Sequence, residues 1–201
     1  MRVVFCLYGD SLLEEARMMV RSCKHFNYDV WQLTDTETPE IEGVDVVVRK
    51  ERNVPQVLFR YRHLSELEGP YLSLDVDLFI ARDVSGIEKP DYDAVMTVRG
   101  NNQGMIYNGG VFWINNNDFI RDCTTLIETY PPEWQDWTGG QRAMAEIGRT
   151  GNYRIKELPC STWNFSPGSS EVDMNQDVRI YHYKGERRKQ YMKDAFKHFY
   201  S

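Results

Sequence analysis

The chain has few cysteines, and they form no paired motif. Cys6, Cys23, Cys123 and Cys160 are widely scattered, and no C-x-x-C pair is present. This spacing argues against a structural zinc site. Reduced thiols in a cytoplasmic protein are the default expectation for such a chain.

Long apolar runs are also missing from the sequence. Its longest runs are far shorter than the roughly 18–20 residues that a membrane span needs. The segment from Met1 to Cys6 is strand-like and has no signal-peptide pattern. We therefore expect a cytoplasmic protein without a transmembrane segment.

Two further absences narrow the function. No G-x-G-x-x-G follows an apolar run, which argues against a Rossmann dinucleotide enzyme. The formal net charge is −6 and the pI about 5.3, so an excess of basic residues is missing too. That balance argues against broad non-specific nucleic-acid binding, although a local basic patch can still contact an anion.

The composition is that of a folded domain with alternating strands and helices. With 201 residues and 41% hydrophobic content, the chain suits one well-filled domain. The apolar patterns predict helices at 11–25, 54–67, 119–130, 140–147 and 187–199. They predict strands at 2–8, 29–34, 44–49, 71–80, 93–98, 109–115, 153–158 and 179–183. This alternation predicts an α/β fold with a mostly parallel, mixed sheet flanked by helices.

The start of the first predicted helix carries a possible cap. Asp10 or Ser11 could cap this helix, and Glu14 stands three residues after Ser11, as in a capping box.

The most informative segment is the apolar run Tyr71–Ile80, which two carboxylates interrupt. Asp75 and Asp77 stand two residues apart, so a strand would direct both to one face. Paired carboxylates favour a divalent cation such as Mg²⁺ or Mn²⁺, which in turn binds phosphate oxygens. A solvated strand face is the simpler alternative, but Asp is depleted in strands. Ligands of open α/β sheets lie at the carboxyl ends of strands, where this pair stands.

A second informative segment runs from Asn108 to Asn115. Gly109 and Gly110 open an apolar strand and would let a ligand approach the backbone closely, while Asn108 could hold a hydroxyl. The alternative is a tight turn before a core strand, because Asn-Gly is a common turn pair.

A third segment places a histidine before a basic helix. His182 ends a predicted strand, and Lys184, Gly185 and Arg188 follow. The histidine could be a third metal ligand, and the cations could bind phosphates. A surface histidine beside a solvated helix is the alternative.

Two more segments could contribute to a binding site. Trp163 and Asn164 could stack on and hydrogen-bond a sugar ring, or could be a core tryptophan beside a turn. Arg60 and Arg62 lie on the helix that precedes the D-x-D run, and we expect one of them to reach the site.

In this order, the segments resemble the nucleotide-sugar-dependent glycosyltransferases of the GT-A fold. The likeness is to the glycogenin-like and bacterial galactosyl- and glucosyltransferases, a family 8-like group, and spans about residues 2–190. The matching positions are the basic Arg60, the D-x-D of Asp75-Val76-Asp77, the run Asn108–Asn115, the pair Trp163-Asn164, and an H-x-x-G-x-x-K-like segment of His182, Gly185 and Arg188.

The resemblance implies a single GT-A-like domain over residues 1–201. A nucleotide-binding half would extend to about residue 80, and a sugar and acceptor half over about 81–201. The implied activity is metal-dependent transfer of a hexose-type sugar from a nucleoside-diphosphate sugar, with UDP favoured, to an acceptor hydroxyl, with retention of configuration. The implied cofactor is Mn²⁺ or Mg²⁺. The acceptor stays open among a glycan, a small molecule and, with least support, a nucleic acid, and the oligomeric state stays open as well.

The resemblance also implies a role for each site residue. The metal would be held by Asp75, Asp77 and His182, and Gln141, Asn108 and Asp136 would lie at the reacting sugar. The expected donor-binding residues are Tyr8 at the base, Arg60, Asp75, Gly109, Gly110, Trp163, Asn164, Lys184, Gly185 and Arg188.

The chain departs from the family at one functional position. Members often carry Asp-Gln before the helix of the second half, whereas this chain has Gly140-Gln141. Asp136, four residues before Gly140, is our candidate substitute. The departure also keeps open a catalytically silent nucleotide-sugar-binding module.

Two other enzyme classes fit the residues less well. A haloacid-dehalogenase-like phosphohydrolase also uses D-x-D, but usually on the first strand and followed by Gly-Thr, whereas Leu78-Phe79 follow here. A nucleotidyltransferase would need a glycine-rich basic loop after the first strand, and the segment Tyr8–Ser11 is not one.

Overall fold

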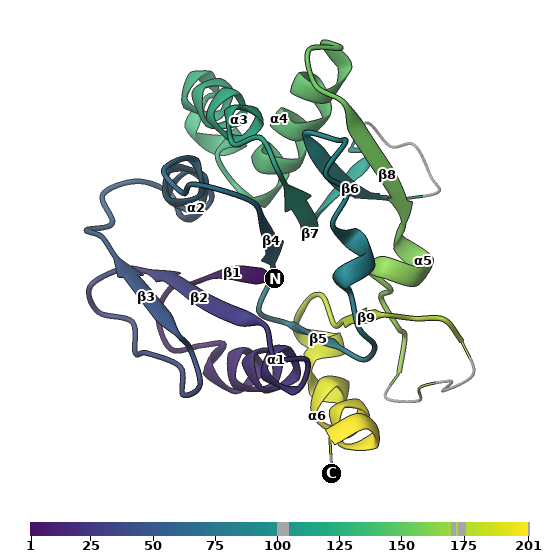
Figure 1. Ribbon diagram of the computed structural model, residues 1–201. Helices are drawn as coiled ribbons and strands as arrows, with labels where there is room; N and C mark the ends of the chain where they lie inside the picture. The colour runs from purple at the N-terminus through teal and green to yellow at the C-terminus, as the bar shows by residue number, and fades with distance from the viewer. Residues whose placement is uncertain (100–104, 170–171, 173–175, 201) are drawn as a thin grey trace.

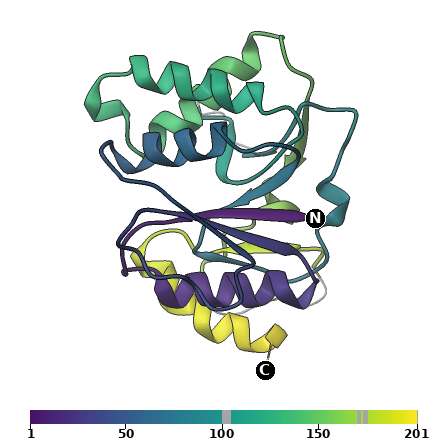
Figure 2. The same ribbon diagram turned by 60° about the vertical axis from the view of Figure 1, so that its left-hand side comes forward.

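A central sheet separates two layers of helices in the computed structural model, which describes residues 1–99, 105–169, 172 and 176–200 (Figures 1 and 2). One face is covered by α1 (Leu13–His25) and α6 (Glu186–Tyr200). The other face is covered by α2 (Gln56–Ser65), α3 (Asp118–Thr129) and α4 (Trp137–Arg149). The α/β class predicted from the sequence is confirmed.

The main sheet is mixed and mostly parallel, as predicted. Its order is β3-β2-β1-β4-β7-β6-β8, and within it β7 is antiparallel to both neighbours while the other pairs are parallel. The strands are β1 (Arg2–Leu7), β2 (Asp29–Thr34), β3 (Val46–Arg49), β4 (Tyr71–Leu74), β6 (Ala94–Val98), β7 (Tyr107–Ile114) and β8 (Ile155–Pro159). Because β4 and β6 both run opposite to β7, their carboxyl ends lie at the same edge of the sheet.

A second, two-stranded sheet joins β5 (Leu78–Ile80) to β9 (Ile180–His182) in antiparallel register. Phe79 packs in an aromatic cluster with Tyr181 of β9 and with Phe196 of α6. This cluster anchors β9 and α6 against the rest of the fold. Short helical turns complete the chain as η1 (Ser85–Ile87), η2 (Pro132–Trp134) and α5 (Cys160–Trp163).

The run Tyr71–Ile80 is two strands rather than the single strand that we predicted. β4 ends at Leu74 in the main sheet, and β5 begins at Leu78 in the second sheet. The buried Leu74 pairs with Val111, and the D-x-D segment then crosses from one sheet to the other. The paired carboxylates therefore lie in a link between sheets, where they can face a cavity instead of a ladder.

The predicted cap of α1 is wrong. The helix begins at Leu13, so Leu12 is the N-cap residue, and its side chain makes no capping hydrogen bond. Asp10 contributes only its backbone oxygen, which accepts a 3.4 Å hydrogen bond from Leu13 N. With this start Glu14 is the second helical residue, one position too early to complete a capping box.

The helices of the described residues were compared with the length and apolarity of a membrane-spanning helix. None of them combines the length and the apolarity that a membrane crossing requires.

Candidate active site

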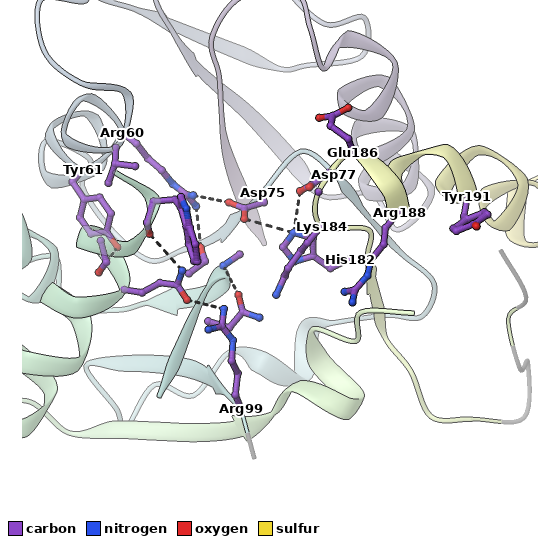
Figure 3. A pocket seen from close by; sticks show the side chains of 18 of the residues that line it. Arg60, Tyr61, Asp75, Asp77, Arg99, His182, Lys184, Glu186, Arg188 and Tyr191 are labelled. Carbon is purple, nitrogen blue, oxygen red and sulfur yellow. Dashed lines mark hydrogen bonds and ion pairs between the residues drawn. The ribbon is translucent and has the colours of Figure 1, made fainter. Parts of the chain in front are cut away.

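Three potential metal ligands meet where the two sheets adjoin. Each of Asp75, Asp77 and His182 offers a ligand atom, and these atoms lie within 4.8 Å of one another. Nε2 of His182 lies 2.9 Å from Oδ1 of Asp77 and 3.6 Å from Oδ2 of Asp75 (Figure 3). The register of β5 and β9 produces this meeting, because Leu78 stands directly opposite His182.

The orientation of His182 is set from behind by Asn164. Asn164 Nδ2 donates to Thr97 Oγ1 at 3.0 Å, so its Oδ1 is the atom that faces His182 Nδ1, at 2.8 Å. Nδ1 therefore carries a proton, and Nε2 is the nitrogen directed at the carboxylates. A histidine held by a hydrogen bond on one nitrogen with carboxylates at the other is the usual arrangement of a metal ligand.

The charges of the three groups fit a divalent cation. Two carboxylates and an imidazole nitrogen within this distance would repel unless a positive charge lies among them, and such donors suit Mg²⁺ or Mn²⁺. Burial alone would raise the pKa of Asp77, but without a metal the hydrogen bond from His182, and the positive charge of that ring when both nitrogens carry protons, outweigh burial and lower it; a bound metal would replace the proton on Nε2. Asp77 is therefore a carboxylate at neutral pH.

Gly110 is required for this geometry. A Cβ at Gly110 would lie 2.2 Å from Cε1 of His182 and 2.9 Å from Oδ2 of Asp75, so no larger residue fits. Gly110 N donates to Asn108 Oδ1 at 3.2 Å, and Gly110 O accepts from Asp75 N at 2.9 Å. Gly109 and Gly110 lie within β7, so the tight-turn alternative for this segment is wrong.

Arg60 binds the other carboxylate. Its Nη1 donates to Asp75 Oδ1 at 2.6 Å, and its Nη2 donates to Ser73 Oγ at 3.0 Å and to Gly109 O at 3.3 Å. Arg62 instead pairs with Glu128 at the surface. Of the two arginines on α2, Arg60 is the one that reaches the site.

Two cavities open beside the carboxylates. The larger has a volume of about 1010 Å³ and the smaller about 640 Å³, and both are lined by Asp75, Asp77 and Arg60. The larger cavity brings together most of the residues that the sequence singled out, namely Asn108, Gly109, Gly110, Gln141, His182, Lys184, Gly185 and Arg188 (Figure 3). The smaller cavity contains Tyr8 and Asp136.

The pair Trp163-Asn164 lies outside the lining of both cavities. Asn164 is buried behind His182, and the ring of Trp163 receives the guanidinium of Arg179 at 4.9 Å from its centroid. Asn164 therefore contacts the site through His182, whereas Trp163 packs away from it.

Asp136 and Gln141 lie at different places on α4. Asp136 is the N-cap residue, and its Oδ1 accepts from Thr138 N at 2.8 Å and from Thr138 Oγ1 at 2.6 Å. The hydrogen bond from the Thr138 hydroxyl is the main cause of the lowered pKa of Asp136. Asp136 lines the smaller cavity, whereas Gln141 lines the larger one.

Packing against α2 explains the glycine before Gln141. A Cβ at Gly140 would lie 2.7 Å from Cε2 of Tyr61, whose hydroxyl donates to Gly140 O at 3.1 Å. The ring of Tyr61 occupies the space that an aspartate would need.

Arg99 is a site residue that the sequence analysis missed. It follows β6 directly, lines the larger cavity, and its Nη2 donates to Gln141 Oε1 at 2.8 Å. Its position at the end of a predicted strand could have marked it as a candidate site residue. β6 ends at the same edge of the sheet as β4, and ligands bind at such an edge. Lys184 lies close to Arg99, and its pKa is lowered first by burial and then by the positive charge of Arg99.

No protein-family model and no curated protein matches the chain, whereas many solved structures do. One is the galactosyltransferase LgtC in complex with donor and acceptor sugar analogues, at 11% identity and a TM-score of 0.68, covering 100% of this chain and 97% of LgtC. Another is a glycosyltransferase involved in glycosylation of the major capsid of PBCV-1, at 12% identity and a TM-score of 0.65, covering 96% of this chain and 97% of that one.

A third similar structure is the glycosyltransferase GlyE of Streptococcus pneumoniae, at 15% identity and a TM-score of 0.68, covering 97% of this chain and 59% of GlyE. At such identities the likeness establishes a shared fold, and it extends over nearly all of this chain.

Proposed function

Because this chain has the GT-A fold of those glycosyltransferases, we propose that it is a metal-dependent glycosyltransferase. The donor would be a nucleoside-diphosphate sugar of the hexose type, with UDP favoured, and the acceptor a hydroxyl group. The observation that carries the proposal is the meeting of Asp75, Asp77 and His182 at a cavity that also contains several cations.

The residues present fit a divalent metal, which Asp75, Asp77 and His182 would hold. When bound, Mn²⁺ or Mg²⁺ supplies Lewis-acid stabilisation of negative charge on a diphosphate leaving group. Asn164 keeps Nε2 of His182 directed at the carboxylates. Arg60 compensates one of the two carboxylates through its 2.6 Å contact with Asp75.

The cations of the larger cavity suit the diphosphate. Lys184 and Arg188 line it from the segment that follows His182 (Figure 3). Charge-assisted hydrogen bonds from such groups to phosphate oxygens are short and strong. They would stabilise the departing diphosphate as the bond between the anomeric carbon and the phosphate oxygen breaks.

The sugar would lie on the Asn108 and Gln141 side of the larger cavity. Both side chains line it, and Arg99 fixes the amide oxygen of Gln141. In the smaller cavity Tyr8 provides an aromatic ring for the nucleotide base, and this ring is backed by Phe59 at a centroid distance of 5.2 Å.

The positions of the carboxylates in the larger cavity support retention of configuration. Inversion needs a carboxylate base near the acceptor hydroxyl. Of the described carboxylates that line this cavity, Asp75 and Asp77 would hold the metal, and Glu186 is 91% exposed and pairs with Lys189 on its own helix. In a retaining transfer the acceptor proton can pass to the departing diphosphate, so no protein base is required.

The proposal is tested by binding and turnover in the same samples. Thermal shifts would be measured with UDP, GDP, ADP and TDP, each with Mn²⁺, Mg²⁺ or chelator, because a ligand of the folded state raises the melting temperature. We expect one nucleoside diphosphate to stabilise the protein only with metal. Asp77→Asn should abolish that stabilisation and the release of diphosphate from the matching nucleotide sugar, whereas Asp91→Asn, at an exposed turn, should change neither.

Other outcomes would assign the chain elsewhere. A protein that no nucleotide stabilises, but that hydrolyses aryl phosphates, would be a phosphohydrolase. Donor binding without transfer to any acceptor or to water would indicate a silent nucleotide-sugar-binding module.

A further inference from the structure

Arg99 places a positive charge in the larger cavity, and no carboxylate of the described residues matches it. Among the residues that the structure describes, its hydrogen-bond partner is the neutral amide oxygen of Gln141, and no ion pair includes it. Arg60 differs, because Asp75 compensates it at 2.6 Å. A half-buried guanidinium with a single neutral partner keeps most of its N–H donors available for a ligand.

The charges of the described lining residues leave room for one more anion. Its described lining has the cations Arg60, Arg99, Lys184 and Arg188 against the acids Asp75, Asp77 and Glu186, an excess of one positive charge with His182 neutral. A divalent metal adds two positive charges, and the diphosphate of a nucleotide sugar removes two. Among the described lining residues, one positive charge remains after the metal and the diphosphate are counted.

The position of Arg99 indicates that the remaining positive charge lies on the side of the cavity where the sugar is proposed to bind. Arg99 contacts Gln141 and enters from the end of β6, whereas the metal ligands lie at the end of β4 and on β9. In Figure 3 Arg99 lies well apart from Asp77 and Glu186.

We propose that Arg99 is a specificity-determining residue that binds a carboxylate on the donor sugar, so that the donor is a nucleoside-diphosphate hexuronic acid. This inference rests on the proposed glycosyltransferase function and adds the substrate class. The planar guanidinium can give a carboxylate two parallel N–H donors, which a neutral hydroxymethyl group cannot use equally well. A neutral hexose would leave the extra positive charge uncompensated in a partly enclosed site.

The test compares matched donors on the wild-type protein and three variants. Dissociation constants would be measured calorimetrically with Mn²⁺ for UDP, UDP-glucose and UDP-glucuronic acid, and for UDP-galactose and UDP-galacturonic acid. If another base is favoured, GDP, GDP-mannose and GDP-mannuronic acid replace them. Free nucleoside diphosphate is the internal reference, because it has no sugar for Arg99 to bind.

We expect the wild type to bind at least one uronate donor about 10-fold or more tightly than the neutral donor. The reason is that a bidentate pair between an arginine and a carboxylate is strong enough to give such a preference. Arg99→Gln should weaken uronate binding by about 10- to 100-fold, with the nucleoside diphosphate and neutral donors changed less than about threefold. Arg99→Lys should retain part of the preference. Arg62→Gln, which removes a surface cation from α2, should change none of these constants.

A role of Arg99 only in orienting Gln141 would lower turnover of all donors equally and leave their binding ratio unchanged, which would overturn the proposal. Equal weakening of every nucleotide would instead assign Arg99 to the diphosphate. An effect confined to the KM of an anionic acceptor would assign it to the acceptor. Nucleotide binding without uronate preference overturns this inference alone, and absence of all nucleotide binding overturns the proposed function with it.

Discussion

His182 shows how the site is fixed at the scale of single residues. Its ring is held between Asn164 Oδ1 at 2.8 Å and Asp77 Oδ1 at 2.9 Å, with Gly110 against its edge. Each neighbour restricts the ring of His182 in one way. Asn164 selects the tautomer, Asp77 sets the direction of Nε2, and Gly110 limits how far the ring can shift toward β7. A ligand that is held before the metal arrives loses little conformational entropy on binding.

Gly110→Ala should therefore damage the proposed metal site specifically. The added Cβ would displace His182 or Asp75, and we expect Mn²⁺ affinity to fall by about 10- to 100-fold, as for losses of the groups that orient metal ligands. The measurement is a Mn²⁺ titration followed by electron paramagnetic resonance. Gly168→Ala is the matched control, because Gly168 lines the same cavity and a Cβ there meets no atom within 4 Å. Equal Mn²⁺ affinity in the two variants would contradict the argument.

The residues of the site differ in how visible they are in sequence. Asp75, Asp77 and His182 could be proposed because ionisable side chains at strand ends are unusual and their chemistry is specific. Asn164 could be marked as polar but not as the partner of His182, because that contact joins distant segments. Arg99 carried a positional signal, but its contact with Gln141 depends on how α4 packs.

At the scale of elements, the sequence predicted the helices and strands well and their breaks less well. Periodicity identifies an apolar run such as Tyr71–Ile80, but it does not say that the run leaves one sheet and joins another. That division depends on β9, which lies about a hundred residues later and pairs with β5. The missing cap of α1 has a similar origin, because the chain enters the helix through a backbone turn instead of a side-chain cap.

The contact of α2 with α4 yields a prediction about stability. Gly140→Ala should destabilise the wild type, because its Cβ meets the ring of Tyr61 at 2.7 Å in a packed core. In a Tyr61→Leu background the ring atoms of that clash are gone. There the same change should stabilise the protein by up to about 1 kcal/mol, the preference of a helix for Ala over Gly.

Urea unfolding of the four proteins in this cycle measures the coupling between the two positions. Gly86→Ala is the control, because its Cβ would make an ordinary 3.5 Å contact with Trp163, so it should be additive with Tyr61→Leu. The packing argument fails if Gly140→Ala has the same effect in both backgrounds.

At the scale of the whole molecule, one edge of the sheet collects the functional groups. β4 and β6 end there, β7 begins near it, and β9 carries His182 to it from the second sheet. Asp75 and Asp77 line both cavities, whereas Arg99, Lys184 and Arg188 line only the larger one. A net charge of −6 therefore coexists with a cavity that several cations line.

The pH dependence of the unfolding free energy should be set in part by His63, because its side chain is buried. It is 2% exposed, neither ring nitrogen has a hydrogen-bond partner among the described residues, and burial, followed by the charge of Lys50, lowers its pKa to about 4. The unfolded chain binds a proton near pH 6.5, so stability is complete above that pH and is lost as the pH falls toward 4. Relative to His63→Leu, the wild type should lose about 3 kcal/mol of unfolding free energy over this interval.

Urea unfolding at several pH values measures this difference in unfolding free energy. The same difference should persist when the exposed His198 is changed in the control variant His198→Gln. Parallel pH profiles for the wild type and His63→Leu would show that His63 is not the group whose protonation unfolds the protein.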